Sequence, residues 1–257
     1  MFYKTKNSDN SILLHIPHAS LVIPAEEKEY FLLDDAALEK EKLIMTDMHM
    51  DRMCENIPVN MLVSDISRLV VDMERYEDDS DEGMAQYGMG LAYINAHDGK
   101  PLRIVSEDYR AELISKYYRP YHAEMKAMCE GNVGRHGKCL ILDMHSFPTA
   151  PIFCVCYPEV LPDVCIGFNG NDDPLAGFAR QYFETKGYAV SMNRPFSGAI
   201  IPAGLEPSIA GDLKSLMIEI NRKLYMDEKT GIINDGYYSM RESISGFISE
   251  ILAIWVW

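Results

Sequence analysis

The sequence predicts an α/β protein with a mixed, largely parallel central sheet and helices on both faces. Short runs rich in Val, Ile and Leu alternate along the chain with stretches that have helical patterning, and this alternation is typical of such sheets. The hydrophobic content of 47% and charged content of 25% are those of an ordinary globular protein. At 257 residues the chain is long enough for one large α/β domain or two small ones, and it has no Gly/Ser linker, so we expect residues 1–257 to form a single domain.

Composition narrows the partners that the protein can have. A formal net charge of -15 argues against nucleic acid and anionic membranes, because both need clustered Lys and Arg. The first ten residues lack the apolar core of a signal peptide, and no apolar run reaches the ~20 residues of a membrane span. We expect a cytoplasmic protein that binds a small molecule, with a homo-oligomer left open.

The six cysteines do not form the spacing of a disulfide framework. Cys154 and Cys156 lie in the apolar run "PIFCVCY", where a strand would place both on one face as buried thiols in a reducing compartment. A metal site built on this CxC pair is the alternative, but no second cysteine pair follows at ligand spacing.

The predicted elements follow one another along the chain. In the first half we expect a strand over 11–17 and a helical stretch in two or three pieces over 25–57. One or two strands over 59–76 and a long acidic loop over 77–103 follow. A loop of that length in a compact domain is more often functional than not.

The second half begins with a long helix for which Ser106 is the expected N-cap. Pro120 interrupts its pattern and predicts a kink beside His122. After it we expect strands over 138–146 and 151–157, a helix over 174–187, and a strand with its loop over 188–199. A strand running towards a helix over 215–226 and a helix over 243–255 complete the predicted elements.

Two buried strands end in histidine. The first is "LLHIPHAS", with His15 and His18, and the second is "LILDMHS", with His145. Ligands of open α/β sheets bind outside the carboxyl ends of the strands, and imidazole is a preferred zinc ligand. Two strands delivering histidine to this edge indicate a metal site, whereas each histidine alone is readily explained as a core or surface residue.

A carboxylate ligand is expected from "TDMHMD". If this stretch is helical, Asp47 and Asp51 share one face and His49 points elsewhere. His97 and His136 lie in polar, turn-like stretches and are not expected in the site.

Glu219 interrupts the apolar strand "SLMIEIN". A buried carboxylate must be paired, metal-bound or catalytic, and burial raises its pKa towards the range of general acid–base catalysis. A salt bridge to Arg222 or Arg68 is the structural alternative.

Arginines follow in "SRLVVDMER" and "NRPFSGA". Strand alternation would place Arg68 and Asp72 on one face, where they can pair. Arg75 and Arg194 could present planar guanidinium groups to a substrate carboxylate, with surface salt bridges as the alternative. Asn193 favours a turn, and Gly198 would let the backbone approach a ligand.

Taken in order, seven stretches resemble the N-formylglutamate amidohydrolase family. They are "HIPHAS", "TDMHMD", "SRLVVDMER", "YYRPYH", "LDMHS", "NRPFSGA" and "IEINRKLYMD", and they run from residue 15 to about 228. The resemblance implies a catalytic domain related to zinc carboxypeptidases and aspartoacylase-like deacylases, with one Zn²⁺ per chain.

The resemblance also implies roles for individual residues. His18 and His145 would bind zinc, and Glu219 would activate the zinc-bound water. The position of the carboxypeptidase glutamate, three residues after the first histidine, is Leu21 here, so we expect Asp47 as the carboxylate ligand, with Asp51 and Glu27 as alternatives.

Two departures lie where substrate contacts are expected. The family often has Asn-Arg where this chain has Glu74-Arg75, and Gly-Gly where it has Gly198-Ala199. They leave the acyl group and the amino acid of the substrate open.

The reaction implied is hydrolysis of a small N-acyl amino acid such as N-formyl-L-glutamate. Arg68 or His122 would stabilise the oxyanion, and Arg75 and Arg194 would bind the substrate carboxylate. The sequence also leaves two other classes of protein open. A carboxypeptidase-like or peptidoglycan-type peptidase would have an open cleft, and a non-catalytic ligand-binding domain would lack zinc and hold Glu219 in a salt bridge.

Overall fold

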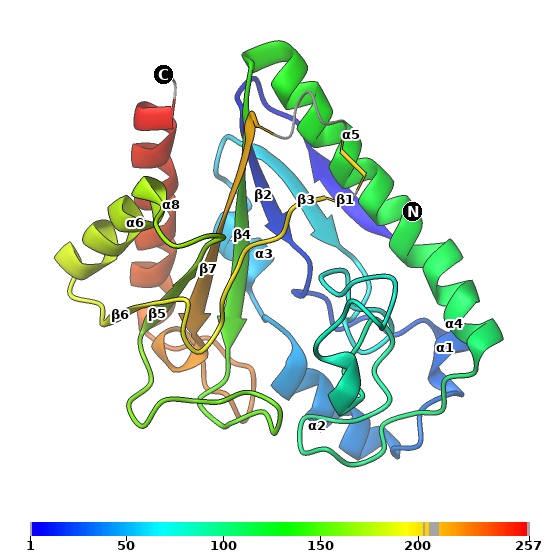
Figure 1. The fold of residues 1–257 in the computed structure, drawn as a ribbon. Helices are drawn as coiled ribbons and strands as arrows, with labels where there is room; N and C mark the ends of the chain where they lie inside the picture. Colours follow the sequence, from blue (N-terminus) through cyan, green and yellow to red (C-terminus); the bar gives the residue numbers. More distant parts are fainter. Residues whose placement is uncertain (1, 203, 206–210, 256–257) are drawn as a thin grey trace.

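A seven-stranded sheet forms the centre of the computed structural model, which describes residues 2–202, 204–205 and 211–255 (Figure 1). The strand order is β1-β3-β2-β4-β7-β5-β6. The strands are Tyr3–Lys6 (β1), Ile12–Ile16 (β2), Asn60–Ser64 (β3), Cys139–Phe147 (β4), Val164–Gly167 (β5), Val190–Met192 (β6) and Leu213–Asn221 (β7). The four central strands β3, β2, β4 and β7 are parallel, so their carboxyl ends meet at one edge.

The outer strands complete a mixed sheet. β1 is antiparallel to β3, β5 is antiparallel to β7, and β6 is parallel to β5. The predicted fold class, a mixed and largely parallel sheet between helices, is confirmed. β1 and β5 were not predicted: β1 is a short polar segment, and the apolar residues of β5 directly follow a run of loop residues.

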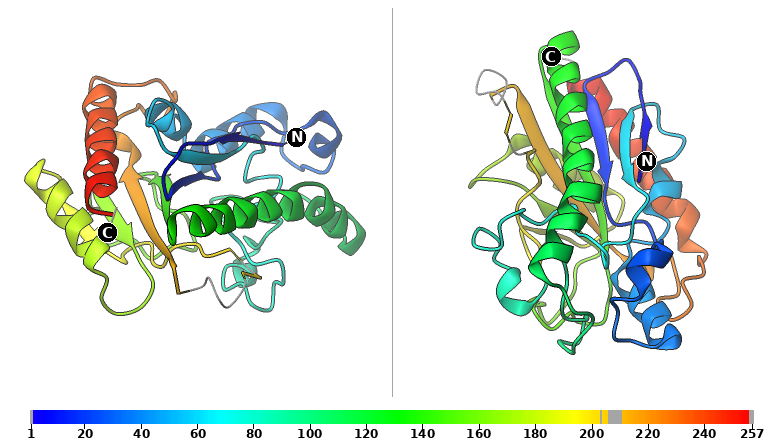
Figure 2. Two further views of the ribbon diagram at one scale, coloured as in Figure 1. Left: turned by 90° about the horizontal axis from the view of Figure 1, so that it is seen from above. Right: turned by 90° about the vertical axis from the view of Figure 1, so that its right-hand side faces the viewer.

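Helices cover both faces of the sheet, as the two views of Figure 2 show. α6 and α8 lie on one face, and α4 and α5 lie on the other. The helices are Ala25–Lys28 (α1), Asp35–Met45 (α2), Met50–Cys54 (α3), Glu107–Leu113 (α4), Arg119–His136 (α5), Pro174–Thr185 (α6) and Gly236–Trp255 (α8), with short turns at Ala85–Tyr87 (η1) and Arg222–Leu224 (η3) and a π-helix at Ile114–Tyr118 (η2).

Alternation along the strands separates two hydrophobic cores. Ile12, Leu14 and Ile16 of β2 pack in the core that contains α3, α6 and α8. Leu13 packs in the core that contains α4 and α5. His15 therefore faces α5, where its ring lies 5.7 Å from the ring of Tyr121.

Most predicted helices are found close to the expected positions. Ser106 caps α4, since its hydroxyl accepts a hydrogen bond from the amide of Tyr109 at 3.2 Å. The expected break near Pro120 is a π-helical turn that ends before α5 begins at Arg119. The stretch 25–57 forms three short helices, as predicted.

The prediction of one or two strands over 59–76 is confirmed only in part, and the strand predicted over 151–157 is wrong. Of the stretch 59–76, only Asn60–Ser64 is a strand, and the rest is a looped segment. Side chains cap its turns: the hydroxyl of Ser67 accepts from the amide of Leu69, and the carboxylate of Asp72 accepts from the amide of Glu74. Such local hydrogen bonds compete with strand pairing.

The stretch 151–157 is also a series of turns. Cys154 is half-buried and Cys156 is exposed, so the two thiols do not share a buried strand face. All six cysteines are free thiols. Within the described ranges, no helix has both the length and the apolar character needed to cross a membrane.

Candidate active site

The carboxyl edge of the parallel strands carries a cluster of histidines and carboxylates. His145 lies near the end of β4, and Glu219 occupies the paired position of β7, so both side chains lie side by side. His18 follows β2, and the looped segment after β3 supplies residues 68–75. The topology therefore brings together four segments that are far apart in the sequence.

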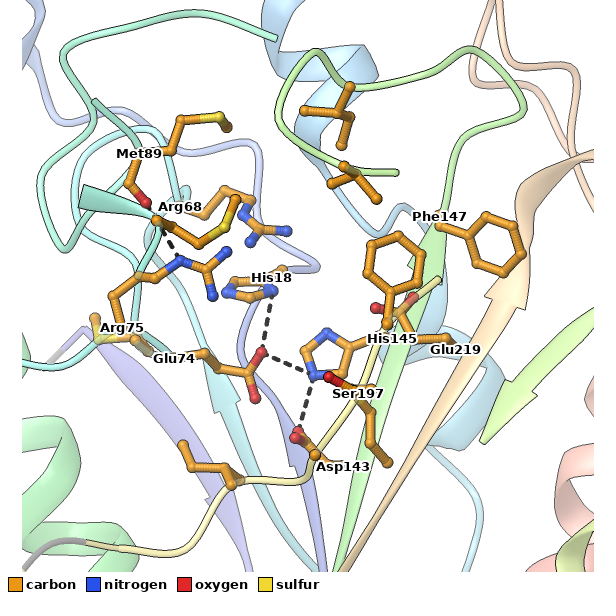
Figure 3. Close-up of a pocket in the computed structure, with 18 of the residues that line it drawn as sticks. His18, Arg68, Glu74, Arg75, Met89, Asp143, His145, Phe147, Ser197 and Glu219 are labelled. Carbon is orange, nitrogen blue, oxygen red and sulfur yellow. Dashed lines mark hydrogen bonds and ion pairs between the residues drawn. The ribbon is translucent and has the colours of Figure 1, made fainter. Parts of the chain in front are cut away.

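These residues line a pocket of about 560 Å³ (Figure 3). The charged residues and histidines that line it are His18, Arg68, Glu74, Arg75, His122, Asp143, His145, Glu219 and Arg222. Met84, Met89 and Tyr93 of the acidic stretch 77–103 also line it. This stretch forms one wall of the pocket.

His18 is almost fully buried, with one ring nitrogen bound and the other unpartnered. Nε2 lies 2.8 Å from Oδ1 of Asp72. Among the described residues Nδ1 has no hydrogen-bond partner, and it lies 3.8 Å from both Oε2 of Glu74 and Oδ2 of Asp47. Burial, and then the charge of Arg68, lowers the pKa of His18 to about 4. A neutral imidazole with a free ring nitrogen is the form that binds a metal.

His145 lies between carboxylates on both sides of its ring. Nδ1 is 3.1 Å from Oδ2 of Asp47, and Nε2 is 3.0 Å from Oε2 of Glu74 and 2.9 Å from Oδ1 of Asp143. Burial opposes the charged form of His145, but the surrounding carboxylates hold its pKa well above the usual range.

The donor set fits a divalent cation. One ligand atom each from His18, Glu74 and His145 lies within 4.8 Å of the others, and His15, Glu74 and Asp143 form a second such group. The first group has the two-imidazole, one-carboxylate composition of catalytic zinc sites. Aspartates bind the far ring nitrogens of both of its histidines, as Asp72 does for His18 and Asp47 for His145, and metal-binding histidines are usually held in this way.

Glu74, and not Asp47, completes this group in the structure. Asp47 lies on the Nδ1 side of His145, and its Oδ1 accepts a hydrogen bond from Nη2 of Arg222 at 2.9 Å. Glu27 is bound by the hydroxyl groups of Tyr109 and Tyr117, and Asp51 lies on α3; neither lines the pocket.

In the sequence, Glu74 stands out only as a departure from the family pattern. The available signal was its place directly after the buried run "LVVDM".

Glu219 is buried in the pocket wall without an ion pair among the described residues. Its Oε2 has no hydrogen-bond partner. The expected alternative partners are occupied, since Arg222 binds Asp47 at 2.9 Å and Arg68 binds Asp72 at 2.8 Å. Burial raises the pKa of Glu219 to about 8, with His145 opposing the shift.

The remaining predicted residues divide into two groups. Arg68, Arg75, His122 and Gly198 line the pocket, and Nε2 of His122 lies 2.9 Å from the carbonyl of Met73.

Arg194 and Asn193 do not line the pocket. Asn193 has φ of 52°, and its Oδ1 accepts hydrogen bonds from the amides of Phe168 and Gly198. Asn193 thus holds the loop that carries Gly198.

Comparison with known proteins decides the family. The sequence pattern of the N-formylglutamate amidohydrolase family matches residues 10–226, which is most of the chain. The chain belongs to the N-formylglutamate amidohydrolase family. Among curated proteins, none matches the chain.

Solved structures agree with the fold of this amidohydrolase family member. An N-formylglutamate amidohydrolase from Ralstonia eutropha JMP134 superposes with a TM-score of 0.84 at 23% identity, over 98% of both chains. A gene product of Agrobacterium tumefaciens superposes with a TM-score of 0.69 at 21% identity, over 98% of this chain and 93% of that chain. The amidohydrolase family indicates a hydrolase that acts on C–N bonds of a small molecule.

Proposed function

We propose that this protein is a zinc-dependent hydrolase of small N-acyl amino acids, with N-formyl amino acids as the reference substrates. The observation that carries the proposal is the group formed by His18, Glu74 and His145. In this group, Nδ1 of His18 has no hydrogen-bond partner among the described residues. These three residues would hold the metal. A bound zinc supplies a Lewis acid and lowers the pKa of a water from ~15.7 towards ~7.

Glu219 is the proposed proton carrier. Its unpartnered Oε2 lies in the pocket beside His145. It takes a proton from the attacking water while the water oxygen bonds to the amide carbonyl carbon. It then delivers this proton to the nitrogen as the C–N bond breaks, which leaves a carboxylic acid and a free amino acid.

Arginines are proposed to bind the charges of substrate and transition state. Arg68 is fixed by Asp72 and by the hydroxyl of Tyr93, at 3.2 Å from its Nε, so its charge is held in place to stabilise the developing oxyanion. Arg75 has Nε on the carbonyl of Met89 at 3.3 Å, and its Nη atoms are proposed to bind the substrate carboxylate. His122 is the weaker candidate for the oxyanion, since its Nε2 binds Met73.

Glu219→Gln tests this mechanism. The variant keeps the shape of the side chain but cannot accept a proton, so kcat for release of formate from N-formyl amino acids should fall by about 10²–10⁴-fold. Zinc content should stay at the wild-type value, because Glu219 is not among the three ligands. Activity within threefold of wild type would contradict the role of Glu219.

The two other classes differ in what they require of the pocket. A non-catalytic binding domain is less well supported, because Glu219 lacks the salt bridge expected of it within the described residues. A peptidase acting on a larger substrate needs an open cleft, whereas the stretch 77–103 contributes a wall here.

A further inference from the structure

The pocket is larger than a formyl group and a small amino acid require. Its volume of about 560 Å³ lies within the range of roughly 300–1,000 Å³ that holds drug-sized ligands. The chemistry of its lining therefore carries information about the rest of the substrate.

The pocket offers one guanidinium group for an anion. Three arginines line it. Arg222 is bound by Asp47 at 2.9 Å and Arg68 by Asp72 at 2.8 Å. Within the described part of the chain, the polar partners of Arg75 are the backbone carbonyl of Met89 at 3.3 Å and the carboxylate of Asp72 at 3.9 Å. An aspartate therefore balances each of the first two arginines, and one net positive charge remains on this side of the pocket.

The rest of the lining disfavours a second anion. Beyond Glu74, which would bind the metal, Asp143 and Glu219 contribute carboxyl groups, and an ionised carboxylate in a buried site repels a second anion. The Arg194 side chain does not reach the lining. Among the described residues, the second charge of a dicarboxylate such as N-formylglutamate would thus find no unpaired cation to receive it.

Apolar side chains form much of the remaining wall. They come from the looped segment after β3, from the stretch 77–103 and from the loops after β4 and β6, and include Met73, Met84, Met89, Ile152, Ile200 and Ile201. Methionine adapts its shape to varied apolar ligands. Burying a hydrocarbon group against such a wall favours substrate binding, whereas burying a charge there disfavours it.

We propose that the substrate carries a single carboxylate, bound by Arg75, and an apolar group on its side chain or its acyl part, in preference to a second carboxylate. This inference rests on the proposed amide hydrolysis and specifies its substrate class. Extending a side chain by one buried methylene contributes about 0.8 kcal/mol, or roughly fourfold in kcat/KM.

The test compares substrates of nearly equal length on zinc-supplemented wild-type protein. N-formyl-L-norleucine should have a kcat/KM at least tenfold above that of N-formyl-L-glutamate, with N-formyl-L-glutamine between them. N-formyl-L-alanine should be roughly 50-fold poorer than norleucine, since it lacks three methylenes. N-hexanoylglycine forms a second arm; if it is hydrolysed faster than N-formylglycine, the apolar wall receives the acyl group.

The outcomes separate the inference from the proposed function. Preference for N-formyl-L-glutamate overturns the inference and leaves amide hydrolysis intact. Hydrolysis of none of these substrates overturns the proposed function and the inference with it.

A gain-of-function variant adds an independent readout. Ile201 lines the pocket and is 51% exposed, so Ile201→Lys adds a cation without burying it. The ratio of kcat/KM for glutamate over norleucine substrates should rise at least fivefold. Ile232→Lys, at an exposed isoleucine outside the lining, should leave the ratio unchanged. An unchanged ratio in Ile201→Lys would contradict the single-carboxylate assignment.

Discussion

At the scale of single residues, the geometry of the site depends on which ring nitrogen of each histidine is hydrogen-bonded to an aspartate. Asp72 binds Nε2 of His18 and Asp47 binds Nδ1 of His145, so the opposite nitrogens face Glu74. Under the proposed function, Glu74 is therefore the carboxylate ligand of the metal, and Asp47 orients His145.

Removal of each carboxylate distinguishes these two roles. Glu74→Ala should lower zinc affinity by well over 100-fold, because it deletes a ligand. Asp47→Ala should lower it by about 10–100-fold, as loss of an orienting partner does. Competition titration with a chromophoric chelator on folded protein measures both. A larger loss in Asp47→Ala than in Glu74→Ala would restore Asp47 as the ligand.

Sequence reasoning reached the histidines more easily than the carboxylate. His18 follows β2 and His145 lies near the end of β4, and a strand end in a parallel sheet is a predictable place for a site. Glu74 and Asp47 both lie in irregular segments, where no periodicity indicates the direction of a side chain. Their roles depend on tertiary contacts, such as that between Asp47 and Arg222, 175 residues apart.

At the scale of elements, the segment after β3 shows why the pattern misled. Its apolar run predicts a strand, yet Ser67 and Asp72 cap turns with their side chains. As turns, this segment can bring Arg68, Glu74 and Arg75 to one pocket. In a strand, alternate residues would point to opposite faces of the sheet.

Another element contact fixes α1 to the long helical segment. Glu27 of α1 accepts hydrogen bonds from the hydroxyls of Tyr109 and Tyr117, both at 2.7 Å, and from Nζ of Lys116 at 2.8 Å. Burial would raise the pKa of Glu27, but these hydrogen bonds lower it below the ordinary value of 4.5.

Glu27→Gln should reduce the free energy of unfolding by about 1–3 kcal/mol at pH 7. Because folding lowers this pKa, the stabilisation is present above pH 4.5 and is lost as the pH falls through the folded-state pKa. The difference in free energy of unfolding between wild type and Glu27→Gln should therefore become smaller at acidic pH. Urea denaturation at pH 7 and pH 4 measures it.

Glu26→Gln is the matched control for this element. Glu26 is exposed and pairs with the same lysine at 3.2 Å, so its loss should change stability by less than about 0.5 kcal/mol. Equal effects of the two substitutions would show that the buried hydrogen bonds of Glu27 contribute nothing beyond surface charge.

At the scale of the whole molecule, the parallel centre of the sheet determines where the site lies. β2, β4 and β7 run in one direction, so His18, His145 and Glu219 reach the same edge. This convergence could be predicted from alternating strands and helices. The antiparallel strands β1 and β5 could not, because short strands leave weak patterns.

A metal that binds the folded chain should stabilise the entire molecule. At a free zinc concentration of 1,000 times Kd the gain is about 4 kcal/mol, which corresponds to roughly 10 °C in Tm for a chain of this size. Zinc should therefore raise Tm in wild type, a chelator should reverse the change, and His145→Ala should show neither response. Equal response in wild type and His145→Ala would place the bound metal elsewhere.

The most direct measurement is metal content by plasma mass spectrometry on protein purified without a metal-binding tag. Wild type should contain about one zinc per chain after zinc supplementation, and His145→Ala should contain almost none. His136→Ala, which changes a histidine outside the pocket, should match wild type. Wild-type protein that binds no zinc even when zinc is supplied would contradict the proposed metal-dependent hydrolysis.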